Sequence, residues 1–135
     1  NRFRTPIKQH AGNRGYEFTP FRLYLKMCKQ REPGSSSLNR GLGKECNLTL
    51  SDIKDLWLSQ DGKCPISGIG LALRTHTNIK DKLSPHHASL DRIDNNLGYI
   101  KGNVRFIAVM ANFARNKFSD EQLVDFCKEV AENNR

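Results

Sequence analysis

The sequence predicts a small α+β domain, because strand-like and helix-like segments follow one another within 135 residues. Residues 87–93 and 104–107 alternate apolar and polar side chains, as half-buried strands do. The turn-forming cluster at residues 94–98 separates them, which predicts a hairpin. Helices are expected before and after this pair, at about 19–31, 49–61 and 108–116 and again after residue 119.

The composition favours a nucleic-acid partner and excludes a membrane protein. The chain has 22 Lys and Arg residues against 14 Asp and Glu residues, so its net charge is +8 and its pI is near 9.6. This excess of positive charge attracts polyanions, of which nucleic acid fits best. No stretch approaches the roughly 20 apolar residues that span a bilayer, and no signal peptide opens the chain. Because the chain begins at Asn1, we expect a processed chain or an excised domain. The reduced thiols predicted below indicate an intracellular protein.

The first predicted helix carries basic residues. Thr19 and Pro20 are typical of an N-cap and a first helical position, so we expect a helix from there to about Arg31. Arg22 and Lys26 on this helix are candidate contacts to nucleic-acid phosphates, or else they form a solvated face.

Composition divides the chain into two parts. Residues 1–16 contain four basic residues and few apolar ones, which is typical of a basic arm. Pro, Gly and Ser dominate residues 33–43, which predicts a flexible linker. We therefore expect an arm, helix and linker over residues 1–45 and one compact domain over residues 46–135.

The second helix has clear end signals. Thr49 and Asp52 have the spacing of a capping box, with Asp in the usual Glu position. Asp61 and Gly62 end the helix. Residues 71–73 are expected to form a short strand. The apolar stripe of this helix consists of Ile53, Leu56 and Trp57.

The last helix is expected to begin after Ser119. Ser119 would be the N-cap and Gln122 would complete the capping box, with acidic residues filling the first turn. Four apolar residues recur at helical spacing, and we expect them to form a buried stripe: Leu123, Phe126, Cys127 and Val130.

The cysteines predict reduced thiols. The chain has four, Cys28, Cys46, Cys64 and Cys127, at spacings of 18, 18 and 63 residues. No close C-x2-C pair occurs among them, so a structural zinc site is not expected. A scattered zinc site formed by Cys64 and a His, and a disulfide, remain as alternatives.

An acidic residue on a predicted strand and an amide on the next helix suggest a site for a hard cation. Asp91 and Asn112 can meet if that helix packs across the hairpin. Together they offer two oxygen ligands, and water and phosphate can fill the remaining positions, as Mg²⁺ prefers. Mn²⁺ is also compatible. Arg115 follows Asn112 by one turn and can face the same side.

These residues lie in a stretch that resembles the HNH endonucleases of the ββα-metal superfamily, most closely the nucleases common in phage genomes. Asp61-Gly62-Lys63-Cys64-Pro65-Ile66-Ser67-Gly68 is similar to the segment that leads into their core. The resemblance covers roughly residues 48–133. Its motifs are Ala88-Ser89-Leu90-Asp91-Arg92-Ile93-Asp94, Gly98-Tyr99-Ile100-Lys101-Gly102-Asn103-Val104 and Asn112.

The resemblance implies a small ββα-metal (HNH) core with flanking helices and a role for each matched residue. Asp91 would be a metal ligand on the first strand, and Asn103 would clip the loop between the strands through backbone hydrogen bonds. Asn112 would be the helix-borne metal ligand or would orient one. Arg115 looks like the basic residue found one turn later, and some relatives use a ligand at the position of Asn116.

Arg92 departs from the family pattern. HNH enzymes usually have the general-base His at this position, and Arg stays protonated at biological pH. His87, or else His86, would have to act as the base, although His87 lies about 13 Å from Asp91 along an ideal strand. Asp94 is a second candidate, either as base or as another carboxylate near the metal. Two further alternatives remain open. The motif register could be shifted so that the His86–His87 pair lies at the site, or the chain could bind nucleic acid without cutting it.

The resulting hypothesis is a metal-dependent DNA endonuclease of the homing, restriction or nicking type. The alternative is a non-catalytic nucleic-acid-binding module with a degenerate HNH core. An RNA-binding protein is less favoured, because no aromatic stacking motif accompanies the basic residues. The candidate catalytic residues are His87, Asp91, Arg92, Asp94, Asn103, Asn112 and Arg115. The candidate nucleic-acid contacts are Arg22, Lys26, Lys101, Arg105, Arg115 and Lys117.

Overall fold

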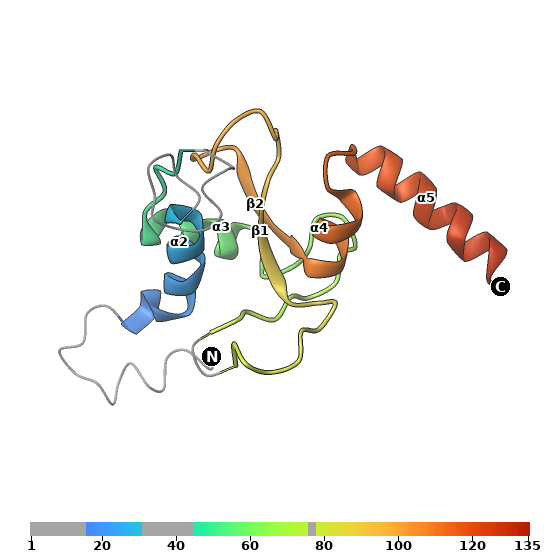
Figure 1. Cartoon of the computed structure of the whole chain (residues 1–135). Helices are drawn as coiled ribbons and strands as arrows, with labels where there is room; N and C mark the ends of the chain where they lie inside the picture. The colour runs from blue at the N-terminus through green and yellow to red at the C-terminus, as the bar shows by residue number, and fades with distance from the viewer. Residues whose placement is uncertain (1–15, 31–44, 76–77) are drawn as a thin grey trace.

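A computed structural model of the chain describes residues 16–30, 45–75 and 78–135 (Figure 1). The predicted basic arm and the Gly/Ser-rich linker lie outside these residues. The described part is a small α+β structure with a two-stranded antiparallel sheet. Its elements are a 3-10 helix η1 (Tyr16–Phe21), α2 (Arg22–Lys29), α3 (Leu50–Ser59), β1 (Ala88–Arg92), β2 (Val104–Ala108), α4 (Val109–Arg115) and α5 (Asp120–Asn133).

The predicted hairpin is confirmed. β1 and β2 pair antiparallel, from Ala88 opposite Ala108 to Arg92 opposite Val104. The alternation that predicted the strands matches their burial only in part, because three consecutive residues of β2 are buried. The predicted strand at 71–73 is wrong: Ala72 makes a single bridge to His87 at the start of the hairpin.

The core lies between the sheet and helices α2 and α3. Phe106 of β2 is fully buried, and its ring is 5.2 Å from that of Tyr24 and 5.3 Å from that of Trp57, both edge-on. Such edge-to-face pairs are the favoured geometry of aromatic rings. Gln60, at the end of α3, donates to the Phe106 carbonyl and accepts from its amide, both at 2.8 Å. The two helices therefore hold the second strand, and Tyr24 of α2 also donates to the Ala88 carbonyl of the first strand at 2.9 Å.

The capping signals of α3 and α5 are confirmed, but those of α2 are not. The Thr49 side chain accepts from Asp52 N, and the Asp52 carboxylate accepts from Thr49 N. Pro20 does not begin the α-helix, because residues from Tyr16 already turn as a 3-10 helix with Pro20 inside it. The α-helix begins at Arg22 after Phe21, whose side chain makes no cap.

The prediction of four reduced thiols is wrong for one pair. Cys28 at the end of α2 and Cys46 before α3 form a disulfide, with Cα atoms 6.1 Å apart. Lys29 donates to the Cys46 carbonyl at the same place. The fold brings these cysteines together from 18 residues apart, which their spacing alone does not reveal. Cys64 is a buried free thiol and Cys127 an exposed one.

Helix α5 begins where expected but is not buried along its stripe. Ser119 and Gln122 form the capping box. Of the four predicted stripe residues, only Leu123 is buried, whereas Phe126 is 60% exposed, Val130 is 45% exposed and Cys127 is exposed too. In Figure 1 α5 projects away from the sheet, and α4 is the described element that it contacts most. None of the helices in the described part of the chain is long and apolar enough to cross a membrane.

Candidate functional site

The loop that joins the two strands is clipped by one buried amide. Asn103 Oδ1 accepts from Asp94 N at 2.8 Å, and its Nδ2 donates to the carbonyls of Asp94 and Gly98. These bonds tie both ends of the turn to the start of β2. The resemblance implied this clip, and the contacts confirm that role of Asn103. Asn103 therefore positions the loop, and it does not line either of the two surface hollows that are described below.

Asp91 lies at the centre of a buried ion-pair cluster. It faces Arg105 across the hairpin, and Arg105 Nε donates to its Oδ2 at 3.0 Å. Arg115 Nη2 donates to both Asp91 oxygens, at 3.0 and 2.9 Å. Arg105 also forms a bidentate pair with Asp120 at the start of α5, 2.7 Å on each arm. Both partners of Asp91 are cations, so its orientation is firmly held and its charge is offset.

The cluster shifts the acidity of its outer members. The hydrogen bonds from Arg105 hold the pKa of Asp120 below its usual range, against a smaller opposing effect of burial. The same bonds, with those to Asp91, raise the pKa of Arg105. Arg105 and Asp120 therefore stay charged at neutral pH, and the cluster joins two arginines to two aspartates.

Asp91 and Asn112 line the same hollow. This hollow, which we call the polar hollow, has a volume of about 380 Å³. β1, the turn after it and α4 contribute to its wall, so the helix does pack across the hairpin. Its lining residues are Leu90, Asp91, Arg92, Asn95, Tyr99, Asn112, Phe113 and Asn116.

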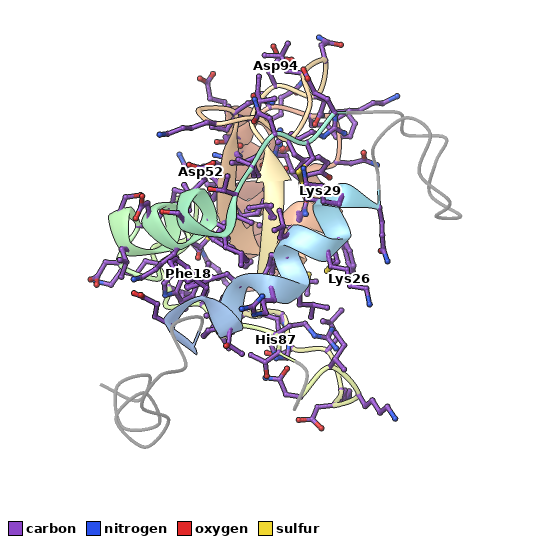
Figure 2. The ribbon with its side chains drawn as sticks, turned by 90° about the vertical axis from the view of Figure 1, so that its left-hand side faces the viewer. Phe18, Lys26, Lys29, Asp52, His87 and Asp94 are labelled. Atoms are coloured by element: carbon purple, nitrogen blue, oxygen red, sulfur yellow. A yellow bond between two sulfur atoms is a disulfide. The ribbon has the colours of Figure 1, made fainter. Side chains whose placement is uncertain are left out.

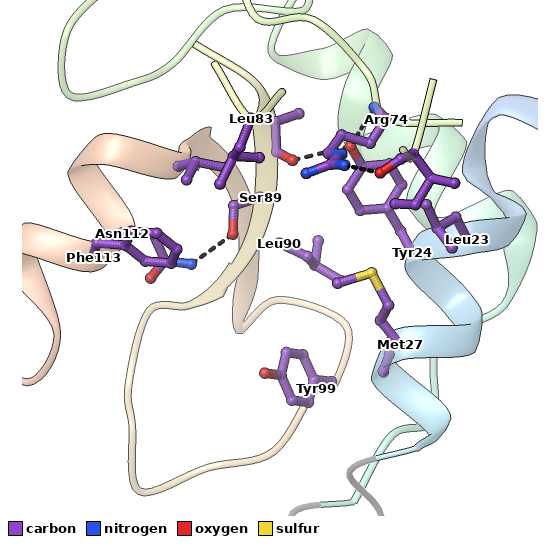
Figure 3. Close-up of a pocket in the computed structure, with 14 residues that line it drawn as sticks. Leu23, Tyr24, Met27, Arg74, Leu83, Ser89, Leu90, Tyr99, Asn112 and Phe113 are labelled. Atoms are coloured by element: carbon purple, nitrogen blue, oxygen red, sulfur yellow. Dashed lines mark hydrogen bonds between the residues drawn. The ribbon is translucent and has the colours of Figure 1, made fainter. Parts of the chain in front are cut away.

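The amide of Asn112 is oriented by a hydrogen bond to β1. Its Nδ2 donates to Ser89 Oγ at 2.6 Å, which leaves its Oδ1 turned away from that bond (Figure 3). Asn112 occupies a helical position that its propensity disfavours. The bond to Ser89 gives a reason for its presence there, because it fixes which atom of the amide is available to a ligand.

Arg92 stabilises the turn by hydrogen bonds and also lines the polar hollow. Its Nη1 donates to the carbonyls of Asn95 and Leu97, at 2.8 and 3.0 Å. The group also lies 5.4 Å from the centre of the Tyr99 ring, a cation–π distance. A guanidinium has five N–H donors, so the remaining ones are suited to an anion in the hollow.

The candidate bases lie outside the polar hollow. His87 and Asp94 are at opposite ends of β1 (Figure 2). His87 is buried, and its Nδ1 accepts from Ser84 N at 2.8 Å, so it secures the turn before the hairpin. Asp94 is exposed and accepts from Asn96 N, as a turn residue does. His86, the residue before His87, is exposed, and neither histidine lines the polar hollow.

The predicted phosphate contacts divide into two groups. Arg22, Lys26, Lys101 and Lys117 are exposed, as such contacts require. Lys101 also lies 3.9 Å from an Asp52 oxygen. Arg105 and Arg115 are wrong as phosphate contacts, because both are committed to Asp91, and Arg115 donates further to the carbonyls of Arg92 and Phe118.

Sequence reasoning missed three contributors to this site. Ser89, Asn95 and Asp120 received no role, yet Ser89 orients Asn112, Asn95 lines the polar hollow and Asp120 holds Arg105. One signal was available, because a hairpin with this turn places Asp91 opposite Arg105. Opposite charges at facing positions of antiparallel strands attract each other.

The polar hollow offers a hard cation a small but suitable donor set. Asp91 and Asn112, which line it, carry carboxylate and amide oxygens, and Mg²⁺ commonly takes one or two carboxylates together with water and phosphate. Residues 16–30, 45–75 and 78–135 contain no group of three His, Cys, Asp or Glu side chains that could hold a metal. The guanidinium groups of Arg105 and Arg115 offset the charge of Asp91, so the Asp91 carboxylate attracts a bare divalent cation less strongly. The residues therefore fit a cation best when an anionic ligand accompanies it.

Comparison of the chain with protein-family models, with curated proteins and with solved structures finds no significant match.

Proposed function

We propose that this protein is a metal-dependent endonuclease of the HNH type, which hydrolyses phosphodiester bonds of DNA in the polar hollow. The observation that carries the proposal is that Asp91 and Asn112, from different elements, line one hollow next to Arg92. The order β1, clipped loop, β2, α4 supports a ββα-metal core. The net charge of +8 supports a polyanionic substrate.

Asp91 and Asn112 would hold one divalent cation, Mg²⁺ by preference and Mn²⁺ as a substitute. Such an ion supplies Lewis-acid stabilisation to the charge that develops on a phosphate under attack. Arg105 and Arg115 act as positioning residues, because they fix the Asp91 carboxylate. Ser89 does the same for Asn112. The free donors of Arg92 would bind a non-bridging phosphate oxygen.

The described chain places no dedicated proton acceptor in the polar hollow. The guanidinium of Arg92 has donors and no acceptor, and Asp91 is held by two arginines. Three of the other lining residues are asparagines, which do not titrate. Deprotonation of the attacking water therefore depends on solvent, and we expect slow cleavage whose rate rises by roughly tenfold per pH unit between pH 6 and pH 9.

Charge favours a second function, nucleic-acid binding without catalysis. Arg92, Arg105 and Arg115 carry three positive charges around the polar hollow, against two negative charges on Asp91 and Asp120. The local excess is one positive charge, which suits a phosphate group. A degenerate HNH core that binds the DNA backbone would have this balance.

A plasmid-nicking assay separates the two functions. The nuclease predicts nicking by the wild-type protein in Mg²⁺ or Mn²⁺, none in EDTA, and a loss of 10² or more in rate for Asn112→Ala. Asn134→Ala is the matched control, because Asn134 is exposed at the end of α5 and its side chain donates to Val130 O, far from the hollow's lining residues. A protein that shifts DNA on a gel but never nicks it would be the binding module. If the protein neither shifts DNA on a gel nor nicks it, both proposed functions are wrong.

A further inference from the structure

A second hollow opens beside the polar hollow. Its volume is about 240 Å³, and it lies between α2 on one side and α4 on the other (Figure 3). We call it the apolar hollow. Four residues line both hollows, so the two lie side by side: Leu90, Tyr99, Asn112 and Phe113. A ligand in the apolar hollow would therefore touch the same Asn112 that we assign to the cation.

The walls of the apolar hollow suit a flat ligand with polar edges. Leu23 and Met27 of α2 form one wall, and Leu83 lies at the top of the view in Figure 3. Arg74 and Ser89 add polar atoms.

Phe113 stands at the junction of the two hollows. It is 72% exposed, more than any other large apolar side chain of the described residues. It follows Asn112 directly on α4 and lies beside it in the close-up of the hollow (Figure 3). Nothing in the core requires an aromatic ring at this position. Exposed aromatic rings next to a phosphate-binding groove are the platforms on which proteins stack unpaired bases.

We infer that the apolar hollow binds an unpaired nucleobase of the substrate, stacked on Phe113, next to the phosphate held in the polar hollow. The inference rests on the proposed nucleic-acid function and names its substrate class, single-stranded or locally unpaired DNA. The volume of 240 Å³ is below that of drug-sized pockets, which suits one planar base. A base inside a duplex is stacked and paired, so it cannot enter such a hollow without being extruded.

The test uses a fluorescent base analogue. A 20-nucleotide oligonucleotide carrying one 2-aminopurine is titrated with protein in Ca²⁺, as a single strand and as a perfect duplex, with anisotropy and fluorescence intensity recorded together. The variants are Phe113→Ala and Phe113→Trp, which keeps a stacking ring. Met110→Ala is the matched control, because Met110 is 58% exposed on the same helix and lines neither hollow.

We expect the wild-type protein to bind the single strand at least tenfold more tightly than the duplex, with quenching of the 2-aminopurine. Phe113→Ala should lose affinity for the single strand on the order of tenfold and lose the quenching. Phe113→Trp and Met110→Ala should retain both. If Phe113→Ala binds and quenches like the wild type, or the duplex is preferred, the base-binding hollow is wrong and the nuclease proposal stands. If neither DNA binds, both proposals fail.

Discussion

Neutralising Asp91 should destabilise the protein as well as remove a ligand. Asp91 is 5% exposed and accepts three hydrogen bonds from two guanidinium groups. In Asp91→Asn the side chain keeps its size but loses its charge. Arg105 keeps its bidentate pair with Asp120, whereas Arg115 keeps only a longer contact, from its Nε to Asp120 Oδ1 at 3.5 Å. Removing one partner of a buried pair costs about 3–5 kcal/mol, and the surviving Arg105 pair places this variant near the lower end, at about 3 kcal/mol.

Urea unfolding followed by tryptophan fluorescence measures this loss, because Trp57 is buried in the core. With a urea dependence of about 2 kcal/mol per molar, the midpoint should fall by about 1.5 M. Asp94→Asn is the control, because Asp94 is exposed and the amide can still accept from Asn96 N. Its midpoint should stay within the equivalent of about 0.5 kcal/mol of the wild type. A loss below about 1 kcal/mol for Asp91→Asn would show that the cluster does not hold Asp91 as described.

Three further perturbations test other contacts. Asn103→Ala removes all three bonds that clip the loop, and its unfolding free energy in urea should fall by about 2–4 kcal/mol; an unchanged midpoint would contradict the clip. The pKa of Asp120 is lower in the folded protein than in the unfolded chain, so its ionised carboxylate stabilises the fold above about pH 4. This stabilisation is lost as the pH falls through the pKa that Asp120 has in the folded protein. Asp120→Asn should therefore lose less melting temperature between pH 7 and pH 3 than the wild type, and equal losses would refute the linkage. A Cβ on Gly98 would lie 2.4 Å from the Glu45 carbonyl, whereas one on Gly70 would meet nothing within 4 Å. Gly98→Ala should thus lower the melting temperature by several degrees and Gly70→Ala should not, and similar values for the two would argue against the close packing at Gly98.

Local signals predicted the parts of the fold that local interactions determine. The capping residues Thr49 and Ser119 bond to groups three residues away, so sequence spacing contains all of the required information. The hairpin follows in the same way from alternation and the turn at 94–98, and the clip by Asn103 acts within that loop.

Long-range contacts explain the errors. The disulfide between Cys28 and Cys46 depends on how α2 packs beside the segment before α3. The apolar stripe of α5 has the period of a buried face, yet periodicity does not say whether another element covers it. The overall charge predicts Arg105 as a phosphate contact, and the position one turn after Asn112 predicts Arg115, whereas the hairpin register and α4 direct both side chains to Asp91.

The central claim is that Asp91 and Asn112 bind one divalent cation together with a phosphate group. A crystal of the protein with a DNA oligonucleotide and Mn²⁺, measured at the manganese absorption edge, tests it most directly. The account predicts one anomalous peak in the polar hollow, within coordination distance of the Asp91 carboxylate, of Asn112 Oδ1 and of a phosphate oxygen. A phosphate bound there to Arg92 with no anomalous peak beside Asp91 and Asn112 would contradict it, and the protein would then be a nucleic-acid-binding module.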